Sequence, residues 1–167
     1  MTIRIYPDPV LRVRCREIET FDDNLRALAE SMVETMHEAP GVGLAASQVG
    51  IEERICVVDP TGGDDEGAVL VLVNPVISEA LGSETDTEGC LSIPGLTEKV
   101  NRPLRIQVDA QDLEGRPMAL EAEGLVARII CHEVDHLDGV LFIDRLMGLR
   151  RERAKRRLKL LVSEARA

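Results

Sequence analysis

The 167-residue sequence predicts an α+β fold, with antiparallel sheets packed around a central helix that carries an HExxH motif and with a further helix at the carboxyl end. Three observations support this class. Segments with helical spacing precede and follow a middle region of β-branched segments, these β-branched segments come in neighbouring pairs, and helices and strands do not alternate as in a parallel sheet. No internal repeat or linker interrupts the chain, so we expect one domain over residues 1–167.

The first predicted helix covers residues 22–37. Its apolar residues recur at intervals of three and four, which is the spacing of an amphipathic helix; they are Leu25, Leu28, Ala29, Met32, Val33 and Met36. Thr20 or Asp22 is expected near the amino-terminal cap, and Pro40 followed by Gly41 ends the pattern.

Two pairs of strands are predicted next. Residues 54–58 and 68–77 are rich in β-branched side chains and flank a tip at 62–67 that contains Gly and Asp, which favours antiparallel pairing. Residues 104–108 and 117–123 form the second expected pair, around a turn at 112–115. The chain then returns to helical spacing at 125–138, where Gly139 is a typical carboxyl-terminal cap, and a last helix is expected from about Leu149 to Glu164.

The composition is that of a globular protein, with 44% hydrophobic and 30% charged residues. The amino terminus has no apolar signal segment, and no apolar run approaches the ~20 residues of a membrane span. We therefore expect a cytoplasmic protein that does not contact a membrane. In that compartment the four cysteines are expected to be thiols or metal ligands rather than disulfides.

The formal net charge of −10 argues against a general polyanion-binding protein. The charge is uneven, however: residues 150–167 contain eight basic and two acidic residues, so this tail carries about +6 and the remainder about −16. The basic tail has two interpretations, a solvated helix face and a surface for nucleic acid.

The motif HEVDH at 132–136 is the strongest chemical signal. Two histidines four residues apart lie on one face of a helix, roughly 6 Å apart along its axis, so one cation can contact both. Glu133 projects to the side of that cation, which suits a carboxylate that transfers protons on a bound water rather than a ligand. His37, the third histidine, is expected at a helix end without a catalytic role.

A third ligand is expected among the cysteines. Cys131 points about 100° around the helix from His132, and Cys56 lies in an apolar strand where a core role is favoured. Cys15 lies between two arginines that would lower its pKa, but nothing near it has ligand spacing. Cys90, in the polar and glycine-bearing stretch EGCLS, is the best candidate. Two imidazoles, one thiolate and a water make a catalytic arrangement.

The segment GVGLAASQ at 41–48 is dense in small residues that let backbone or substrate approach closely. It lacks the GxxxxGK[ST] pattern, so no nucleotide is expected there. Gln48 offers an uncharged amide donor of the kind that a developing oxyanion requires.

These segments in this order, GVGLAASQ at 41–48, EGCLS at 88–92 and HEVDHLDG at 132–139, resemble peptide deformylase, the enzyme that removes formyl groups from nascent bacterial polypeptides. The likeness spans nearly the whole chain, and the helical carboxyl terminus is similar to the type 1 branch. The resemblance implies that Cys90, His132 and His136 hold the metal, that Glu133 is the acid and base, and that Gln48 with the backbone amide of Leu91 stabilises the intermediate.

The resemblance also implies the cofactor and partners. The family's metal in the cell is Fe²⁺, with Zn²⁺, Ni²⁺ or Co²⁺ as alternatives in the isolated protein. The formylated nascent peptide is expected in extended form beside Gly43 and Leu44, with its methionine in a pocket for which Leu91, Leu125 and Ile129 are candidates; core packing is the competing role for these side chains. The basic last helix would dock on ribosomal RNA near the nascent-chain exit.

The sequence alone is also compatible with two other functions. An HExxH-type metallopeptidase would also attack a carbonyl but would cut internal peptide bonds, and its usual third ligand is Glu or His rather than Cys. A metal-stabilised RNA-binding adaptor without catalysis is suggested only by the basic tail.

Overall fold

The computed structural model describes residues 1–166. Its helices and strands are α1 (Asp23–Glu38), β1 (Gly43–Ala45), β2 (Ile55–Val58), β3 (Leu70–Leu81), β4 (Glu84–Cys90), β5 (Ile93–Arg102), β6 (Arg105–Gln111), β7 (Pro117–Glu123), α2 (Gly124–Leu137) and α3 (Gly148–Arg166). Four short 3-10 turns complete the order: η1 (Pro9–Arg12), η2 (Ala46–Val49), η3 (Glu66–Ala68) and η4 (Phe142–Arg145). The predicted α+β class is confirmed.

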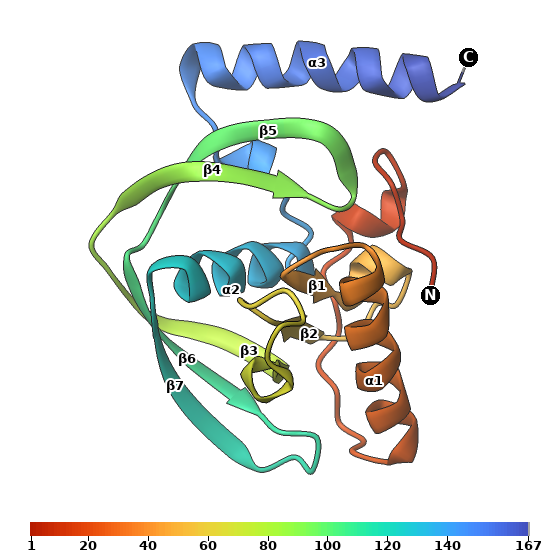
Figure 1. The fold of residues 1–167 in the computed structure, drawn as a ribbon, viewed down its shortest axis with the longest axis vertical. Helices are drawn as coiled ribbons and strands as arrows, with labels where there is room; N and C mark the ends of the chain where they lie inside the picture. Colours follow the sequence, from red (N-terminus) through yellow and green to blue (C-terminus); the bar gives the residue numbers. More distant parts are fainter. Residues whose placement is uncertain (167) are drawn as a thin grey trace.

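The strands form two antiparallel sheets. One has five strands in the order β1-β2-β3-β6-β7, and the other is the hairpin of β4 and β5. Helix α2 lies between the hairpin and the larger sheet, while α3 crosses over β5 on the outside (Figure 1). Strand β1 is at one edge of the larger sheet, so among residues 1–166 its outer side pairs with no strand.

Three apolar clusters hold these layers together. One fills the space between α2 and the larger sheet, a second lies between α1 and strands β1 to β3, and a third joins the hairpin to η1, η4 and α3. Helix α2 is enclosed most completely, because every residue from Ala127 to Leu137 is buried. It therefore offers a rigid platform for functional side chains.

The predicted helices agree closely with the structure. Asp22 caps α1, and its Oδ1 accepts a hydrogen bond from the Leu25 N–H at 3.0 Å. Gly139 follows the end of α2 with a φ of +73°, a left-handed conformation that glycine adopts without strain. Helix α3 is a few residues longer than expected and buries only Ala154 and Leu158.

The predicted strand pairs are also confirmed as antiparallel. Strand β2 pairs with β3, and β6 pairs with β7 across the turn at 112–115. Strand β3 extends to Leu81, four residues beyond the predicted end, because its second half pairs with β6. Two elements were not anticipated: the short strand β1, and the β4–β5 hairpin, whose residues 84–90 show no apolar alternation.

None of the helices within residues 1–166 is both long enough and apolar enough to cross a membrane.

Candidate metal centre

Helix α2 presents the two histidines of the HExxH motif toward the hairpin. His132 and His136 are 8% and 1% exposed, and their ring centroids lie 4.9 Å apart with an edge-to-face orientation. Because they are one helical turn apart on the same face, both rings reach the same point beside α2.

Cys90 reaches that point from the end of strand β4. Its Sγ lies 3.2 Å from Nε2 of His136, and one donor atom from each of Cys90, His132 and His136 lies within 4.8 Å of the others. Within residues 1–166 this is the one group of three such side chains that meets this criterion. The structure therefore brings together the thiol and the two imidazoles that the sequence singled out.

The orientation of His132 is determined by a buried carboxylate. Nδ1 of His132 lies 2.8 Å from Oε1 of Glu88, so Nδ1 carries the proton and Nε2 is left to face the other donors. Burial opposes the charged ring, but the Cys90 sulfur and the Glu88 carboxylate raise the pKa of His132 to about 10. A ring of this basicity is a strong donor to a cation that replaces its proton.

His136 has different surroundings. Burial, followed by the neighbouring His132, holds the pKa of His136 well below its ordinary value, so its ring is neutral and keeps a lone pair. Its Nδ1 is buried and has no hydrogen-bond partner among residues 1–166. One sulfur and two imidazole nitrogens are the donor set that suits divalent transition metals such as zinc or ferrous iron, so these side chains fit a divalent cation.

Glu88 belongs to an ionic network that the sequence analysis missed. Its carboxylate accepts two hydrogen bonds from Arg102, at 2.9 and 2.8 Å, and one from Arg128 at 2.9 Å. Arg102 also donates to Asp135 at 2.6 Å, and Asp135 accepts two hydrogen bonds from Arg145.

This network joins the strand that carries Cys90 to the helix that carries the histidines. Burial alone would raise the pKa of Glu88, but Arg102 and His132 outweigh it and hold that pKa at about 2, so Glu88 is ionised. The sequence did contain a signal, because Glu88 is two residues before Cys90 and residues two apart share one face of a strand.

Glu133 is buried on the same helix as the two histidines. Its carboxylate is not part of the group of donor atoms formed by Cys90, His132 and His136. It is 3% exposed, its Oε2 has no hydrogen-bond partner within residues 1–166, and burial raises its pKa to about 7 despite the opposing charge of His132. A carboxylate with this pKa can both accept and return a proton near neutral pH.

Gly43 leaves the space that the Glu133 carboxylate occupies, because it has no side chain. A Cβ atom at position 43 would overlap the Glu133 carboxylate and would lie 2.8 Å from Cγ2 of Ile129. The absence of a side chain at position 43 of β1 is therefore a packing requirement of this site.

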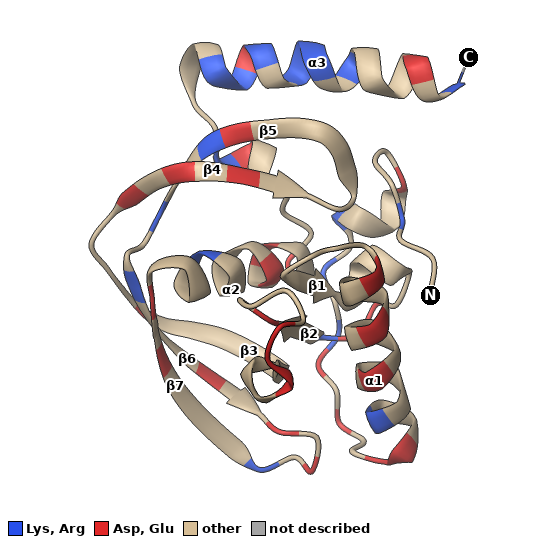
Figure 2. Cartoon of the chain, viewed as in Figure 1, with Lys and Arg blue, Asp and Glu red and all other residues tan. Residues whose placement is uncertain are grey.

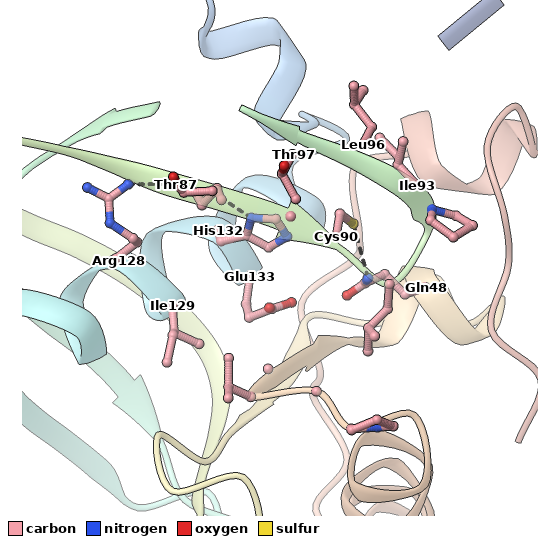
Figure 3. A pocket seen from close by; sticks show the side chains of 18 of the residues that line it. Gln48, Thr87, Cys90, Ile93, Leu96, Thr97, Arg128, Ile129, His132 and Glu133 are labelled. Carbon is pink, nitrogen blue, oxygen red and sulfur yellow. Dashed lines mark hydrogen bonds and ion pairs between the residues drawn. The ribbon is translucent and has the colours of Figure 1, made fainter. Parts of the chain in front are cut away.

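The Gln48 side chain is held on two sides. Its Oε1 accepts a hydrogen bond from the Ala45 N–H at 2.9 Å, which identifies the oxygen, and its Nε2 donates to Oγ of Ser92 at 3.2 Å. The same Nε2 lies 3.7 Å from Sγ of Cys90, as the dashed line in Figure 3 shows. The amide donor therefore points at the convergence of the three ligand candidates.

A cavity of about 390 Å³ is lined by Gln48, Cys90, His132 and Glu133, whereas His136 is buried and does not line it. Figure 3 shows Ile129, His132 and Glu133 on one side of it and Gln48 and Cys90 on the other. Four of the residues predicted at the substrate line this cavity: Gly43, Leu91, Leu125 and Ile129. Leu44 does not, because its side chain is fully buried in the cluster beneath α1.

The remaining cysteines and His37 lie elsewhere. All four cysteines are free thiols, as expected, and Cys56 and Cys131 are buried in the cluster between α2 and the larger sheet. The expected effect of the flanking arginines on Cys15 is wrong: burial is the largest influence and raises its pKa. His37 is near the end of α1, where its Nε2 lies 2.7 Å from Asp59.

Comparisons with known proteins agree with this geometry. Residues 1–152 match the family profile of polypeptide deformylase. A peptide deformylase from Alkalilimnicola ehrlichii is 49% identical over 168 residues, covering 99% of this chain and 93% of that protein, and one from Rhizobium meliloti is 47% identical, covering 94% and 92%.

Solved structures give the same result. The structure of a peptide deformylase from Legionella pneumophila is 41% identical with a TM-score of 0.88, covering 99% of this chain and 98% of that one. A peptide deformylase structure from Plasmodium falciparum is 36% identical with a TM-score of 0.93, covering 99% and 97%. From its fold, its convergent donor set and these relatives, this chain belongs to the polypeptide deformylase family.

Proposed function

We propose that this chain hydrolyses the formyl group at the amino terminus of formyl-methionyl nascent polypeptides and releases formate. The observation that carries this proposal is the meeting of one thiol and two imidazoles beside a buried carboxylate whose Oε2 has no hydrogen-bond partner among residues 1–166, at a cavity lined by Cys90, His132 and Glu133. The enzyme is thus a metal-dependent hydrolase of a linear amide. We also propose that residues 1–167 act as one catalytic domain, and that it works in the cytoplasm, where nascent chains emerge.

We propose Cys90, His132 and His136 as the ligands of the divalent cation, with Fe²⁺ in the cell and Zn²⁺, Ni²⁺ or Co²⁺ as alternatives in the isolated protein. When bound, such a cation polarises the formyl carbonyl and lowers the pKa of water. The one-thiolate, two-imidazole set leaves a coordination position for a small molecule, which supports catalysis rather than a purely structural site.

Glu133 is the proton-transfer residue in this proposal. Its carboxylate accepts the proton of the attacking water and returns it to the departing α-amine. Its raised pKa of about 7 supports both steps, and so does its Oε2 atom, which has no hydrogen-bond partner among residues 1–166 to release first.

Gln48 and Leu91 are the proposed donors to the oxyanion that forms on the former formyl oxygen. The Gln48 amide is fixed by Ala45 and Ser92, and Leu91 lies in the turn between β4 and β5 rather than in a strand. Donors that are already oriented stabilise developing charge without reorganisation.

The substrate is proposed to lie extended along the free edge of β1, where the backbone at Gly43 and Leu44 is available for pairing. Its methionine side chain enters the cavity beside Leu91, Leu125 and Ile129, three apolar side chains that line it. Backbone pairing tolerates many sequences, which suits an enzyme that acts on nascent chains in general.

The decisive experiment measures formate release from formyl-Met-Ala-Ser by protein purified without oxygen, with elemental analysis of the bound metal. We expect one divalent metal ion per chain and stoichiometric formate. Incubation with the unformylated peptide separates the metallopeptidase alternative, which predicts cleavage of an internal bond in both peptides. Absence of formate from metal-loaded protein would refute the proposal.

We further propose that α3 docks on ribosomal RNA near the nascent-chain exit. The helix carries most of its charged side chains on the surface, and Figure 2 shows Lys and Arg along its first half. Attraction of this basic surface to phosphates, against the acidic remainder of the chain, supports the proposal. Cosedimentation of α3 variants with ribosomes tests this proposal.

A further inference from the structure

The amino-terminal arm, residues Arg4–Tyr6, lies against both segments that carry the proposed oxyanion donors. Figure 1 shows the start of the chain beside the turn that joins β4 and β5. The arm has no regular secondary structure of its own up to Tyr6. Its position is therefore determined by the contacts it makes with these neighbours.

Two backbone hydrogen bonds define those contacts. The Arg4 N–H donates to the carbonyl of Gln48 at 2.7 Å, and the Tyr6 N–H donates to the carbonyl of Ser92 at 2.8 Å. The acceptor residues are almost completely buried, with Gln48 1% and Ser92 0% exposed. The arm thus joins η2 to the hairpin turn, two segments that are 44 residues apart in sequence.

These two bonds and one side-chain bond link the arm, Gln48 and Ser92 in a closed loop of contacts. Nε2 of Gln48 donates to Oγ of Ser92 at 3.2 Å, so the two residues that receive the arm are also linked to each other. Ser92 directly follows Leu91, whose amide is the second proposed donor. The arm therefore holds the backbone of Gln48, whose side chain is one proposed donor, and of Ser92, which is next to the other.

Side chains of the arm also contact η2 and the region of the hairpin turn. The Arg4 guanidinium lies over Gly50, where a Cβ atom would be 2.9 Å from Arg4 Nε, and Gly50 ends η2 in a left-handed conformation. Tyr6 packs against the third apolar cluster, which includes Ile93 and is bordered by Cys90. The arm is therefore anchored on both segments by side chains as well as by backbone.

We propose that the backbone amides of Arg4 and Tyr6 are positioning groups that hold the Gln48 amide and the Leu91 amide at the separation needed to bind the oxyanion. This inference depends on the function proposed above. It predicts that loss of either amide lowers kcat, because the donors act on the transition state, and leaves KM and metal content nearly unchanged.

The test removes single N–H groups and leaves every side chain in place. Residues 1–14 are synthesised and joined at Cys15 to recombinant residues 15–167, with an ester in place of the amide at Arg4 or at Tyr6. An ester at Ile5 is the matched control, because the Ile5 N–H has no backbone acceptor within residues 1–166. An all-amide ligated chain is the reference.

We expect the Arg4 and Tyr6 esters to lower kcat for formyl-Met-Ala-Ser roughly tenfold, less than the ~10²-fold cost of a 1 Å misplacement. The Ile5 ester should match the all-amide chain. Asp22→Ala, which removes the cap of the distant α1, serves as a control for general destabilisation. It should lower the unfolding midpoint without lowering kcat at a temperature where the protein is folded.

Equal kcat values for all four ligated chains would overturn the inference, and so would an equal loss of kcat in Asp22→Ala. Absence of formate release from the all-amide chain would instead contradict the proposed function. If the ligated chains do not refold, recombinant Arg4→Pro, which lacks the N–H, is compared with Arg4→Ala, which keeps it. The same difference in kcat is expected between these two variants.

Discussion

Helices α2 and α3 differ in almost every physical property: α2 is a buried helix that carries the two histidines and Glu133, whereas α3 is an exposed basic helix. In α2 every residue from Ala127 to Leu137 is buried, and charged side chains such as Arg128 and Asp135 have defined partners. In α3 only Ala154 and Leu158 are buried, and basic side chains face solvent. A change in α2 should therefore alter catalysis, whereas a change in α3 should alter association or stability.

The largest effect is expected from Glu133→Ala in the middle of α2. Loss of the proton-transfer group should lower formate release by roughly 10²–10⁴-fold. Metal content should stay near that of the wild type, because Glu133 is not a proposed ligand. Kinetics and elemental analysis measure the two quantities, with the exposed Glu121→Ala as a control. Wild-type turnover in Glu133→Ala would refute the assignment.

Gly43→Ala tests the space beside α2 from the facing strand. The new methyl group would overlap the Glu133 carboxylate, so either the carboxylate or β1 must shift. Because a displacement of about 1 Å costs on the order of 10²-fold in rate, we expect a loss of kcat of that size with metal retained. Gly67→Ala, at an exposed position away from the site, should have wild-type kinetics. Unchanged kcat in Gly43→Ala would show that the carboxylate position is not critical.

Glu88→Gln tests the hydrogen bond that orients His132. We expect the metal affinity to fall roughly 10- to 100-fold, as for other carboxylates behind a ligand histidine. Competition with a chelator measures this loss directly. Glu98→Gln is the matched control, since Glu98 lies opposite Glu88 in the hairpin and does not line the cavity. Equal affinities in the two variants would contradict the orienting role.

Asp144→Asn tests an ion pair that Asp144 forms with Arg12 from η4, the turn that lies between α2 and α3 in the chain. The Asp144 carboxylate accepts hydrogen bonds from Arg12 and from the Leu141 N–H. Burial alone would raise the pKa of Asp144, but these two hydrogen bonds outweigh burial and lower that pKa below its ordinary value. A lowered carboxyl pKa stabilises the fold above the unfolded-state pKa of ~3.9, and this stabilisation is lost as the pH falls through the folded-state value.

Asp144→Asn should therefore be less stable than the wild type at pH 6, and the difference should shrink toward pH 3. Because the Asp144 side chain is 33% exposed, we expect an effect of about 1 kcal/mol or less. Urea unfolding at several pH values measures it. A difference independent of pH would exclude the ionised carboxylate as its cause.

The smallest effect on catalysis is expected in α3. Replacing Arg153, Arg156 and Arg157 by Gln should weaken cosedimentation with ribosomes and make it less sensitive to salt. Activity on formyl-Met-Ala-Ser should remain within about twofold, since none of these residues lines the cavity. A chain truncated before Leu149 should bind ribosomes still less, although it also loses the packing of Ala154 and Leu158. Undiminished cosedimentation would identify α3 as a solvated helix.

The accuracy of the sequence-based predictions varied with the range of the interactions involved. Helix α1 was predicted to within one residue at each end, and Asp22 was one of the two expected caps, because the cap bond to Leu25 and the apolar spacing are local. Strand β1 was missed because three residues carry too little pattern. The hairpin was missed because β4 buries Glu88 rather than an alternating apolar set, so only its pairing with β5 makes it a strand.

The sequence by itself determined the α+β class, the helical pair His132 and His136, and the choice of Cys90, because these depend on spacing within one segment and on the types of residue available. Only the tertiary structure decided that Glu88 orients His132, that Gly43 makes room for Glu133, and that Arg4 and Tyr6 attach to Gln48 and Ser92. These contacts join residues 40 or more positions apart, and no local periodicity encodes such pairs, because they form only when the layers of the fold pack together.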